Sequence, residues 1–85
     1  MRRDEAEATV VRIFRDEMAR RGGAMAVNLE SNLARGLELD SVAFVRALVK
    51  VEGALRIRFT ESDLEFDSTL TVKSIAERAK LHLSA

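Results

Sequence analysis

Cysteine is absent from this chain of 85 residues, proline is absent as well, and histidine occurs once, as His82. Without cysteine there is no disulfide, no thiolate nucleophile and no thiolate metal ligand, and one histidine excludes a histidine cluster. Aromatic residues are limited to four phenylalanines, and with the lack of proline this composition favours helices over a sheet. Any thiol chemistry must therefore come from a group added to the chain.

Long hydrophobic runs are also lacking. No apolar stretch approaches the roughly 20 residues that a membrane-spanning helix needs, and the opening residues, MRRDEAEATVV, lack the apolar segment of a signal peptide. We therefore expect a cytoplasmic protein that binds no membrane. Fourteen basic residues balance fourteen acidic ones, so no overall charge attracts nucleic acid. The length predicts one domain over residues 1–85.

Apolar residues at three- and four-residue spacing predict amphipathic helices over residues 4–21, about 41–55 and about 71–83. Thr60 followed by an acid three residues later predicts a capped short helix to about Phe66. The sequence thus predicts an all-α fold of three main helices and one short one.

The ends of the first helix are also marked in the sequence. Asp4 with Glu7 predicts a capping box at its start, and Gly22 with Gly23 predicts a left-handed stop after it. The following residues, to residue 40, show no helical period but are rich in leucine. We predict a long ordered loop pinned to the core by these leucines, and a disordered linker is the alternative.

A short alternation of apolar and basic residues follows the second helix. Leu55, Ile57 and Phe59 alternate with two arginines, as in a strand, but no partner strand is evident elsewhere. We expect an extended connector that turns apolar side chains inward. On the second helix itself, Phe44 and Leu48 should also be buried.

Asp40 and Ser41 stand where the second helix begins, and two interpretations are open. Asp and Ser are common at helix starts, where they satisfy free backbone N–H groups. A serine hydroxyl at a helix N-terminus also suits a phosphodiester, because the exposed N–H groups and the positive end of the dipole stabilise a phosphate. Spacing alone does not decide between them.

Other candidate sites are weaker. A Ser–His–Asp triad would need a fold that brings His82 over Ser41, and His82 fits better as a complement to a helix dipole. Asp63, Glu65 and Asp67 lack the D-x-D-x-D-G loop and closing Glu of a calcium site. We therefore expect a solvated acidic turn and no bound metal.

One basic grouping stands out, formed by Arg46, Lys50, Arg56 and Arg58. No aromatic residue is interleaved with it, which favours a solvated face over a protein-binding surface, and disfavours nucleic acid further. A helix-turn-helix DNA binder is accordingly the third functional alternative.

The segment LELDSV at 37–42 resembles the L-G-x-D-S-[LIV] signature of acyl carrier proteins. Other segments keep that family's order: VRALVKVE at 45–52 is similar to its V-x-x-L-[VI]-x-x-[LI]-E helix, and LRIRF at 55–59 to its F-G-I-x-[IF] connector. DL at 63–64 falls where its short third helix has such a pair, and LTVKSI at 70–75 resembles its T-[VI]-x-x-[LI] helix start. The resemblance covers essentially the whole chain.

This resemblance implies a small four-helix bundle of acyl-carrier type, with a short third helix. It implies that a phosphopantetheinyl transferase, using its own bound magnesium, moves 4′-phosphopantetheine from coenzyme A onto Ser41. The arm would hold acyl or aminoacyl groups as thioesters and present them to a ligase or transferase and to downstream synthase enzymes. The chain itself would be no enzyme, and we expect a monomer. An unmodified helical adaptor with the same bundle is the main alternative.

The chain departs from the family pattern at several positions. Glu38 and Arg56 each replace a usual glycine, and Arg46 and Lys50 stand where fatty-acid carriers often present acidic residues. Complementary charge selects partners, so we expect a dedicated carrier of specialised metabolism. The L-D-S sequence favours acyl or small aminoacyl cargo over the peptidyl carriers, which have G-G-H-S or G-G-D-S. The expected contacts with the transferase and partner enzymes are Asp40, Val42, Arg46 and Lys50.

Overall fold

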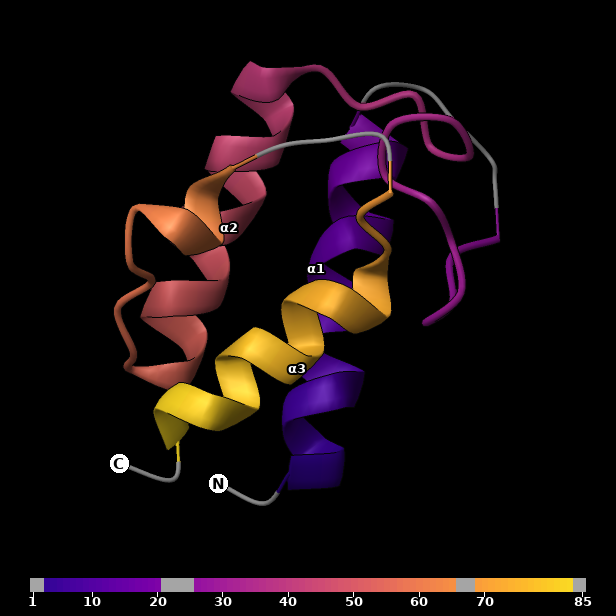
Figure 1. The fold of residues 1–85 in the computed structure, drawn as a ribbon. Helices are drawn as coiled ribbons and strands as arrows, with labels where there is room; N and C mark the ends of the chain where they lie inside the picture. The colour runs from indigo at the N-terminus through magenta and orange to yellow at the C-terminus, as the bar shows by residue number, and fades with distance from the viewer. Residues whose placement is uncertain (1–2, 21–25, 66–68, 84–85) are drawn as a thin grey trace.

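Three α-helices, joined by a long loop and a shorter connector, form the computed structural model of this chain (Figure 1). The structure describes residues 3–20, 26–65 and 69–83. The elements are α1 (Arg3–Arg20), α2 (Ser41–Leu55), the 3-10 turn η1 (Ser62–Leu64) and α3 (Val72–Leu83). No β-strand forms within the described ranges.

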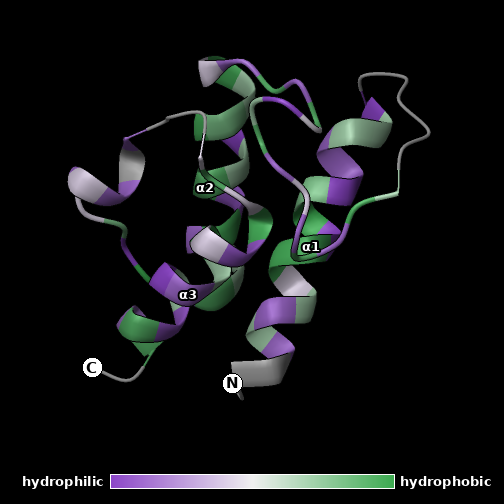
Figure 2. Ribbon diagram, turned by 45° about the vertical axis from the view of Figure 1, so that its right-hand side comes forward, coloured by the Kyte–Doolittle hydropathy of each residue, from purple (hydrophilic) through white to green (hydrophobic). Residues whose placement is uncertain are grey.

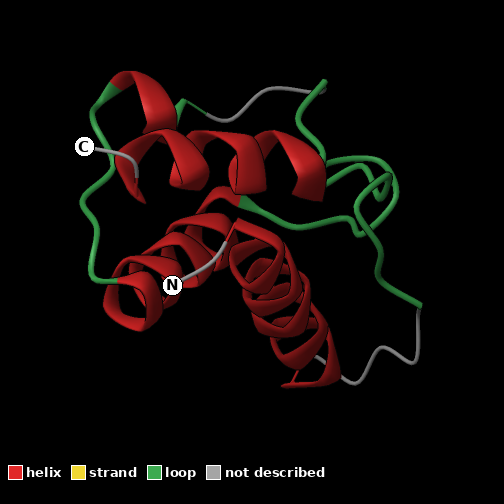
Figure 3. Cartoon of the chain, turned by 90° about the horizontal axis from the view of Figure 1, so that it is seen from below, coloured by secondary structure: helices red, strands yellow, loops and turns green. Residues whose placement is uncertain are grey.

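The other two helices, α2 and α3, both pack against α1. Helices α1 and α2 lie side by side and run in opposite directions, while α3 crosses them obliquely (Figures 1 and 3). Most of the contact between helices is made by α1, which packs against both α2 and α3, whereas α2 and α3 contact each other less. The radius of gyration is 11.7 Å, close to the value of about 12 Å expected for a compact chain of this length.

The predicted apolar faces of the helices meet in one core, and hydrophobic segments face inward in Figure 2. Phe44 and Leu48 are buried on α2 as predicted. The third helix buries Val72, Ile75, Ala76 and Ala79, and Leu83 packs against the same cluster. The largest apolar side chains that are fully buried are Phe14, Phe44, Leu33, Leu48 and Ile75.

The first helix begins earlier than predicted. Asp4 lies inside α1, so the capping box predicted for Asp4 and Glu7 is wrong. The Glu7 carboxylate instead pairs with the Nζ of Lys80, which joins α1 to α3 and holds the pKa of Lys80 above its ordinary value. The stop predicted at Gly22 and Gly23 lies outside the described residues.

The loop that precedes α2 is ordered over residues 26–40, as its leucines predicted. Val27, Leu33, Leu37 and Leu39 are buried in the core. The Leu33 amide donates to the Leu70 carbonyl at 2.9 Å, and an isolated bridge pairs Asn32 with Thr71. The loop is therefore attached to the beginning of α3, where Thr71 and Ser74 exchange side-chain hydrogen bonds with each other's amides.

A close approach within this loop requires glycine at position 36. The Gly36 amide donates to the Asn32 carbonyl at 3.0 Å, and a Cβ on Gly36 would lie 2.8 Å from that same oxygen. The tight turn thus depends on the missing side chain.

A four-helix bundle is not confirmed, because only three α-helices form in the described ranges. The predicted cap of the short helix is present: the Thr60 amide donates to Asp63 Oδ2 at 2.8 Å. The chain then completes a single 3-10 turn, and Glu65 is already extended (φ −70°, ψ 121°). The predicted end at Phe66 lies outside the described residues.

The second helix ends at Arg56 in a left-handed conformation (φ 56°, ψ 49°). The Ile57 amide then donates to the Glu52 carbonyl at 3.1 Å, which is the hydrogen bond of a Schellman-type helix end. The following residues are extended and unpaired, and Phe59 is buried, as expected for the connector. The position of Arg56 is one where glycine has no steric penalty.

Two substitutions near this helix end should each stabilise the protein. Gly53 lies within α2, and a Cβ added there would meet nothing within 4 Å. We expect Gly53→Ala to stabilise by about 1 kcal/mol, from helix propensity. Arg56→Gly should stabilise by a similar amount, about 1 kcal/mol, by removing the left-handed penalty. Thermal unfolding should show a rise in Tm of about 4–8 °C for each.

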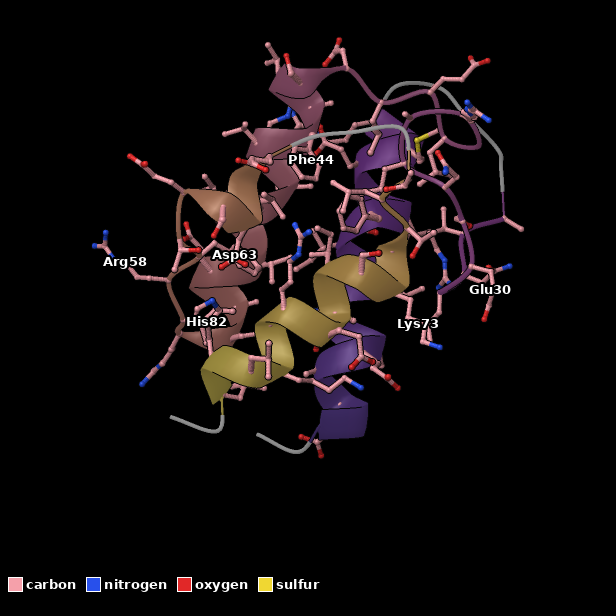
Figure 4. All side chains as sticks on the ribbon, viewed as in Figure 1. Glu30, Phe44, Arg58, Asp63, Lys73 and His82 are labelled. Carbon is pink, nitrogen blue, oxygen red and sulfur yellow. The ribbon has the colours of Figure 1, made fainter. Side chains whose placement is uncertain are left out.

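Arg58→Gly is the matched control. Arg58 is exposed in the extended connector and points away from the molecule (Figure 4). Glycine there adds entropy to the unfolded chain without relieving a left-handed residue, so it should not raise Tm. Equal effects of the two Arg→Gly variants would contradict the role assigned to position 56.

Candidate functional site

Asp40 fixes the start of α2. Its backbone is extended (φ −86°, ψ 173°), and its Oδ1 accepts a hydrogen bond from the Ala43 amide at 2.8 Å. The Asp40 carbonyl accepts the first helical bond, from the Phe44 amide at 3.0 Å. Asp40 is thus the capping residue, and the cap does not use the Ser41 hydroxyl.

Ser41 is the first residue of α2 and is exposed. Its hydroxyl makes no hydrogen bond within the part of the chain that the structure describes. In Figure 1 this end of α2 lies at the top of the molecule, away from α3. Another protein can therefore approach this hydroxyl without moving a helix.

The chain reaches Ser41 through two buried leucines. Leu37 and Leu39 lie in the core, and the Leu39 amide donates to the Leu33 carbonyl at 3.0 Å. Between them Glu38 points outward, with a positive φ of 54°. Because both leucines are anchored, the position of Asp40 and hence of Ser41 follows from core packing.

Three exposed valines follow Ser41 along α2. Val42, Val45 and Val49 are 68%, 45% and 58% exposed, although exposed apolar residues of this size are few in the described chain. Their spacing of three and four residues places them on one face of the helix, opposite the buried face of Phe44 and Leu48. We call these three residues the valine ridge.

A buried carboxylate binds the two cations of α2. Glu17 of α1 is fully buried, and its Oε1 accepts from Arg46 Nε at 2.6 Å while its Oε2 accepts from Lys50 Nζ at 3.0 Å. The side chains of Arg46 and Lys50 remain 44% and 37% exposed. Lys50 is half-buried, because its side chain reaches back to α1.

The pKa of Glu17 reflects two opposing effects. Burial by itself would raise it, because the charged form loses hydration. Hydrogen bonds from Lys50 and Arg46, together with the charges of these two residues, outweigh burial and hold the pKa of Glu17 below its ordinary value. Glu17 is therefore ionised at neutral pH and ties α1 to α2.

Sequence reasoning missed Glu17, although a signal was present. Glu17 follows Ile13 and Phe14 at helical spacing, so it lies on the apolar face of α1. A carboxylate on such a face needs partners, and Arg46 and Lys50 offer two cations one turn apart. The sequence alone does not show how α1 and α2 are aligned, and so does not identify the partners of Glu17.

Replacing Glu17 should give a pH-dependent loss of stability. At neutral pH we expect Glu17→Gln to cost about 2 kcal/mol, because a neutral amide cannot pair with both cations. The pKa of Glu17 is lowered by folding, so its contribution is complete above the ordinary value of 4.5 and is lost as the pH falls through the folded value. Urea unfolding should show that the difference in free energy of unfolding between wild type and Glu17→Gln becomes smaller below pH 4.5.

Asp16→Asn is the control for this measurement, since Asp16 is the exposed neighbour of Glu17 on the same helix. It should change stability by no more than about 0.5 kcal/mol. A cost of Glu17→Gln that stays constant at every pH would contradict the ion pair as the source of the effect.

His82 lies far from Ser41 and has a different partner. Its Nε2 is 2.8 Å from Asp63 Oδ2 (Figure 4). Its ring packs edge-on against Phe59. Burial alone would raise the pKa of Asp63, but the hydrogen bonds from Thr60 and His82 hold it below its ordinary value. His82 thus fastens the connector to the end of α3 and does not form a catalytic pair with Ser41.

The acidic turn does not gather metal ligands in the described ranges. No group of three or more His, Cys, Asp or Glu side chains is placed to hold an ion there. Asp63 is used by Thr60 and His82, Glu65 is exposed, and Asp67 lies outside the described residues.

Comparison with known proteins gives no match: this holds for the protein-family models, the curated proteins and the solved structures. Within the described residues, none of the helices combines the length and the apolar character needed to cross a membrane. The arrangement around Ser41 therefore has to be interpreted from its own geometry.

Proposed function

We propose that this chain is a carrier protein that bears 4′-phosphopantetheine on Ser41. The observation that carries the proposal is the free, exposed hydroxyl of Ser41, in the first turn of a helix whose cap is supplied by its neighbour Asp40. A phosphodiester on Ser41 would lie at the positive end of α2, where free backbone N–H groups stabilise a phosphate. The residues present are thus suited to hold the group.

Two backbone conformations support the resemblance to acyl carrier proteins. Glu38 and Arg56 stand where that family has glycine, and they are the non-glycine residues with positive φ in the described chain, at 54° and 56°. Positive φ is the region that glycine enters without steric cost. The two positions at which the family pattern has glycine thus both have a positive φ, which is the conformation that favours glycine.

The attachment is a transfer of a phosphoryl group to oxygen. In this proposal a phosphopantetheinyl transferase uses its magnesium and coenzyme A. The Ser41 Oγ forms a bond to the phosphorus next to pantetheine, and the pyrophosphate bond of coenzyme A breaks. Adenosine 3′,5′-bisphosphate leaves, and the hydroxyl proton passes to a base of the transferase. The chain has no cysteine, so the arm would supply the thiol on which acyl or aminoacyl groups are held. Tethering raises their effective concentration at each partner enzyme.

The proposed carrier catalyses nothing itself. It acts in the cytoplasm as a monomer, and a ligase or transferase loads it while downstream synthase enzymes use the cargo. The replacement of acidic residues by Arg46 and Lys50 on α2 favours a dedicated pathway over general fatty-acid synthesis. Asp40 and Val42, which flank Ser41 and are exposed, are the proposed contacts nearest to the reaction.

Intact-protein mass spectrometry tests the proposal. The chain is incubated with coenzyme A, magnesium and a broad-specificity phosphopantetheinyl transferase. We expect wild type to gain the mass of one phosphopantetheine and Ser41→Ala to gain none. Ser62→Ala is the matched control, because Ser62 is another exposed serine at the start of a helical turn. It should be modified like wild type.

A chain that several transferases leave unmodified would refute the carrier function. The exposed valine ridge would then favour the second candidate, an unmodified helical adaptor, whose binding would survive Ser41→Ala. Mass added equally to wild type and Ser41→Ala would place the modification elsewhere in the chain.

A further inference from the structure

Two exposed arginines lie directly after α2, on a backbone that the rest of the structure holds in place. Arg56 closes the helix, and Arg58 follows in the connector and points away from the molecule (Figure 4). Neither side chain pairs with any of the described residues. The Ile57 amide donates to the Glu52 carbonyl and the Phe59 amide to Glu52 Oε2. The two guanidinium groups therefore project from a fixed segment into solvent.

Arg56 is held in a backbone conformation that disfavours it. Its φ of 56° is one that glycine adopts without steric cost, so glycine would make the chain more stable. Residues in such costly conformations cluster at functional sites, where stability is given up for the use of a side chain. Because the Arg56 side chain is exposed, that use lies outside the core.

The surface beside α2 carries a net positive charge. Arg46 and Lys50 share one buried carboxylate, that of Glu17, and remain 44% and 37% exposed, so one of their two charges is not balanced. The two arginines after the helix add to it. Glu52, which is half-buried, and Glu61, exposed in the next turn, offset only part of this charge. An anion on this side of the molecule is therefore attracted.

The arginines lie at the opposite end of α2 from Ser41. The helix has 15 residues, so Arg56 is roughly 22 Å from Ser41 along the helix axis. A 4′-phosphopantetheine arm contains two amide units and is about as long as five extended residues, roughly 17 Å. A short acyl group and the long arginine side chain span the remaining distance. A group carried on Ser41 can thus reach the two arginines.

We infer that the cargo of this carrier is an acyl group with a free carboxylate, and that Arg56 and Arg58 bind this carboxylate. A guanidinium group donates two parallel hydrogen bonds to a carboxylate, which makes arginine suited to this group. An exposed contact of this kind is weak for a free ligand. A group tethered to Ser41 is present at an effective concentration of roughly 1 mM or more, which favours the contact. The inference rests on the carrier function proposed above.

A charged cargo also agrees with the apolar interior of the molecule. Phe44, Leu48 and Phe59 are buried and belong to the shared core. A carboxylate that entered this core would lose its hydration at high cost. Such a cargo therefore stays at the surface, where the two arginines are available to it.

The test compares a carboxylate with a neutral amide of the same shape at the end of the arm. The chain is modified with coenzyme A, magnesium and a broad-specificity phosphopantetheinyl transferase. Because the chain has no cysteine, the arm then supplies the one thiol. Iodoacetate alkylates this thiol to give a carboxymethyl group, and iodoacetamide gives its uncharged counterpart. The NMR signals of the arginine Nε–H groups are compared between the two forms.

We expect the Arg56 and Arg58 signals to shift at least about twice as far in the carboxymethyl form as in the amide form. About 0.5 M sodium chloride should remove this difference, because it screens exposed charges. Arg15 is the internal control, since it is an exposed arginine on α1, and its signal should be the same in both forms.

Two variants separate binding from folding. Arg58→Gln should remove the carboxylate-dependent shift at Arg56 and leave Tm unchanged. Arg56→Gly should raise Tm, since it relieves the positive φ, and should at the same time reduce the carboxylate-dependent shift at Arg58 by at least about half. A purely structural role of Arg56 would not move these two measurements in opposite directions.

Three results would overturn the inference, and they can be told apart. A chain that no transferase modifies removes the carrier function and the cargo assignment together. A modified chain whose arginine signals are equal in the carboxymethyl and amide forms refutes the cargo assignment alone. Shifts confined to the amides of Phe44 and Leu48 in both forms would show that the end of the arm enters the core.

Discussion

The ion pairs of Glu17 determine how α1 and α2 lie against each other. Residues of both helices pack in the shared core, and the Glu17 carboxylate with its two bound cations adds a directional constraint on their alignment. Glu17 is the one charged side chain that is buried in the described residues. It is ionised because Arg46 and Lys50 donate hydrogen bonds to its carboxylate. The rotation of α2 that exposes Ser41 and the valines is set by the same contact. Arg46 and Lys50, which the sequence suggests as partner contacts, thus also bind a buried carboxylate, and their side chains remain part-exposed.

The helices could be predicted from sequence because their causes are local. The bounds of α2 match the prediction, since Asp40 and the apolar spacing after it lie within a few residues of each other. The partners of Glu17 and His82 could not be predicted, because each is supplied by another helix or turn. The predicted length of the short helix was wrong for a related reason. Its cap forms as expected, but the chain is extended directly after η1. Local signals start an element, and distant contacts determine how far it continues.

The same distinction between local and distant causes applies to the candidate site. Ser41 was identified by a signature of six residues, and its exposure agrees with what attachment would require. The left-handed conformations of Glu38 and Arg56 do not follow from the residue types, which disfavour positive φ, and they were not predicted, although both positions hold glycine in the resembling family. The proposed partner contacts at Arg46 and Lys50 were inferred from charge alone. Charge in a sequence says which residues can form ion pairs and leaves open whether the partner is inside the molecule.

The attachment of the loop to the start of α3 has a consequence for how the molecule opens. Leu33 binds Leu70, Val72 binds Ser31, and Lys73 binds Leu29, all through the backbone. The chain that leads to Ser41 therefore cannot detach without exposing the first turn of α3, and fraying of α3 would release the loop in turn. Opening in this region is cooperative across some forty residues of sequence. In hydrogen exchange the amides of Leu33, Val72 and Lys73 would behave as a single protected group, so the segment before Ser41 shares the lifetime of a helix.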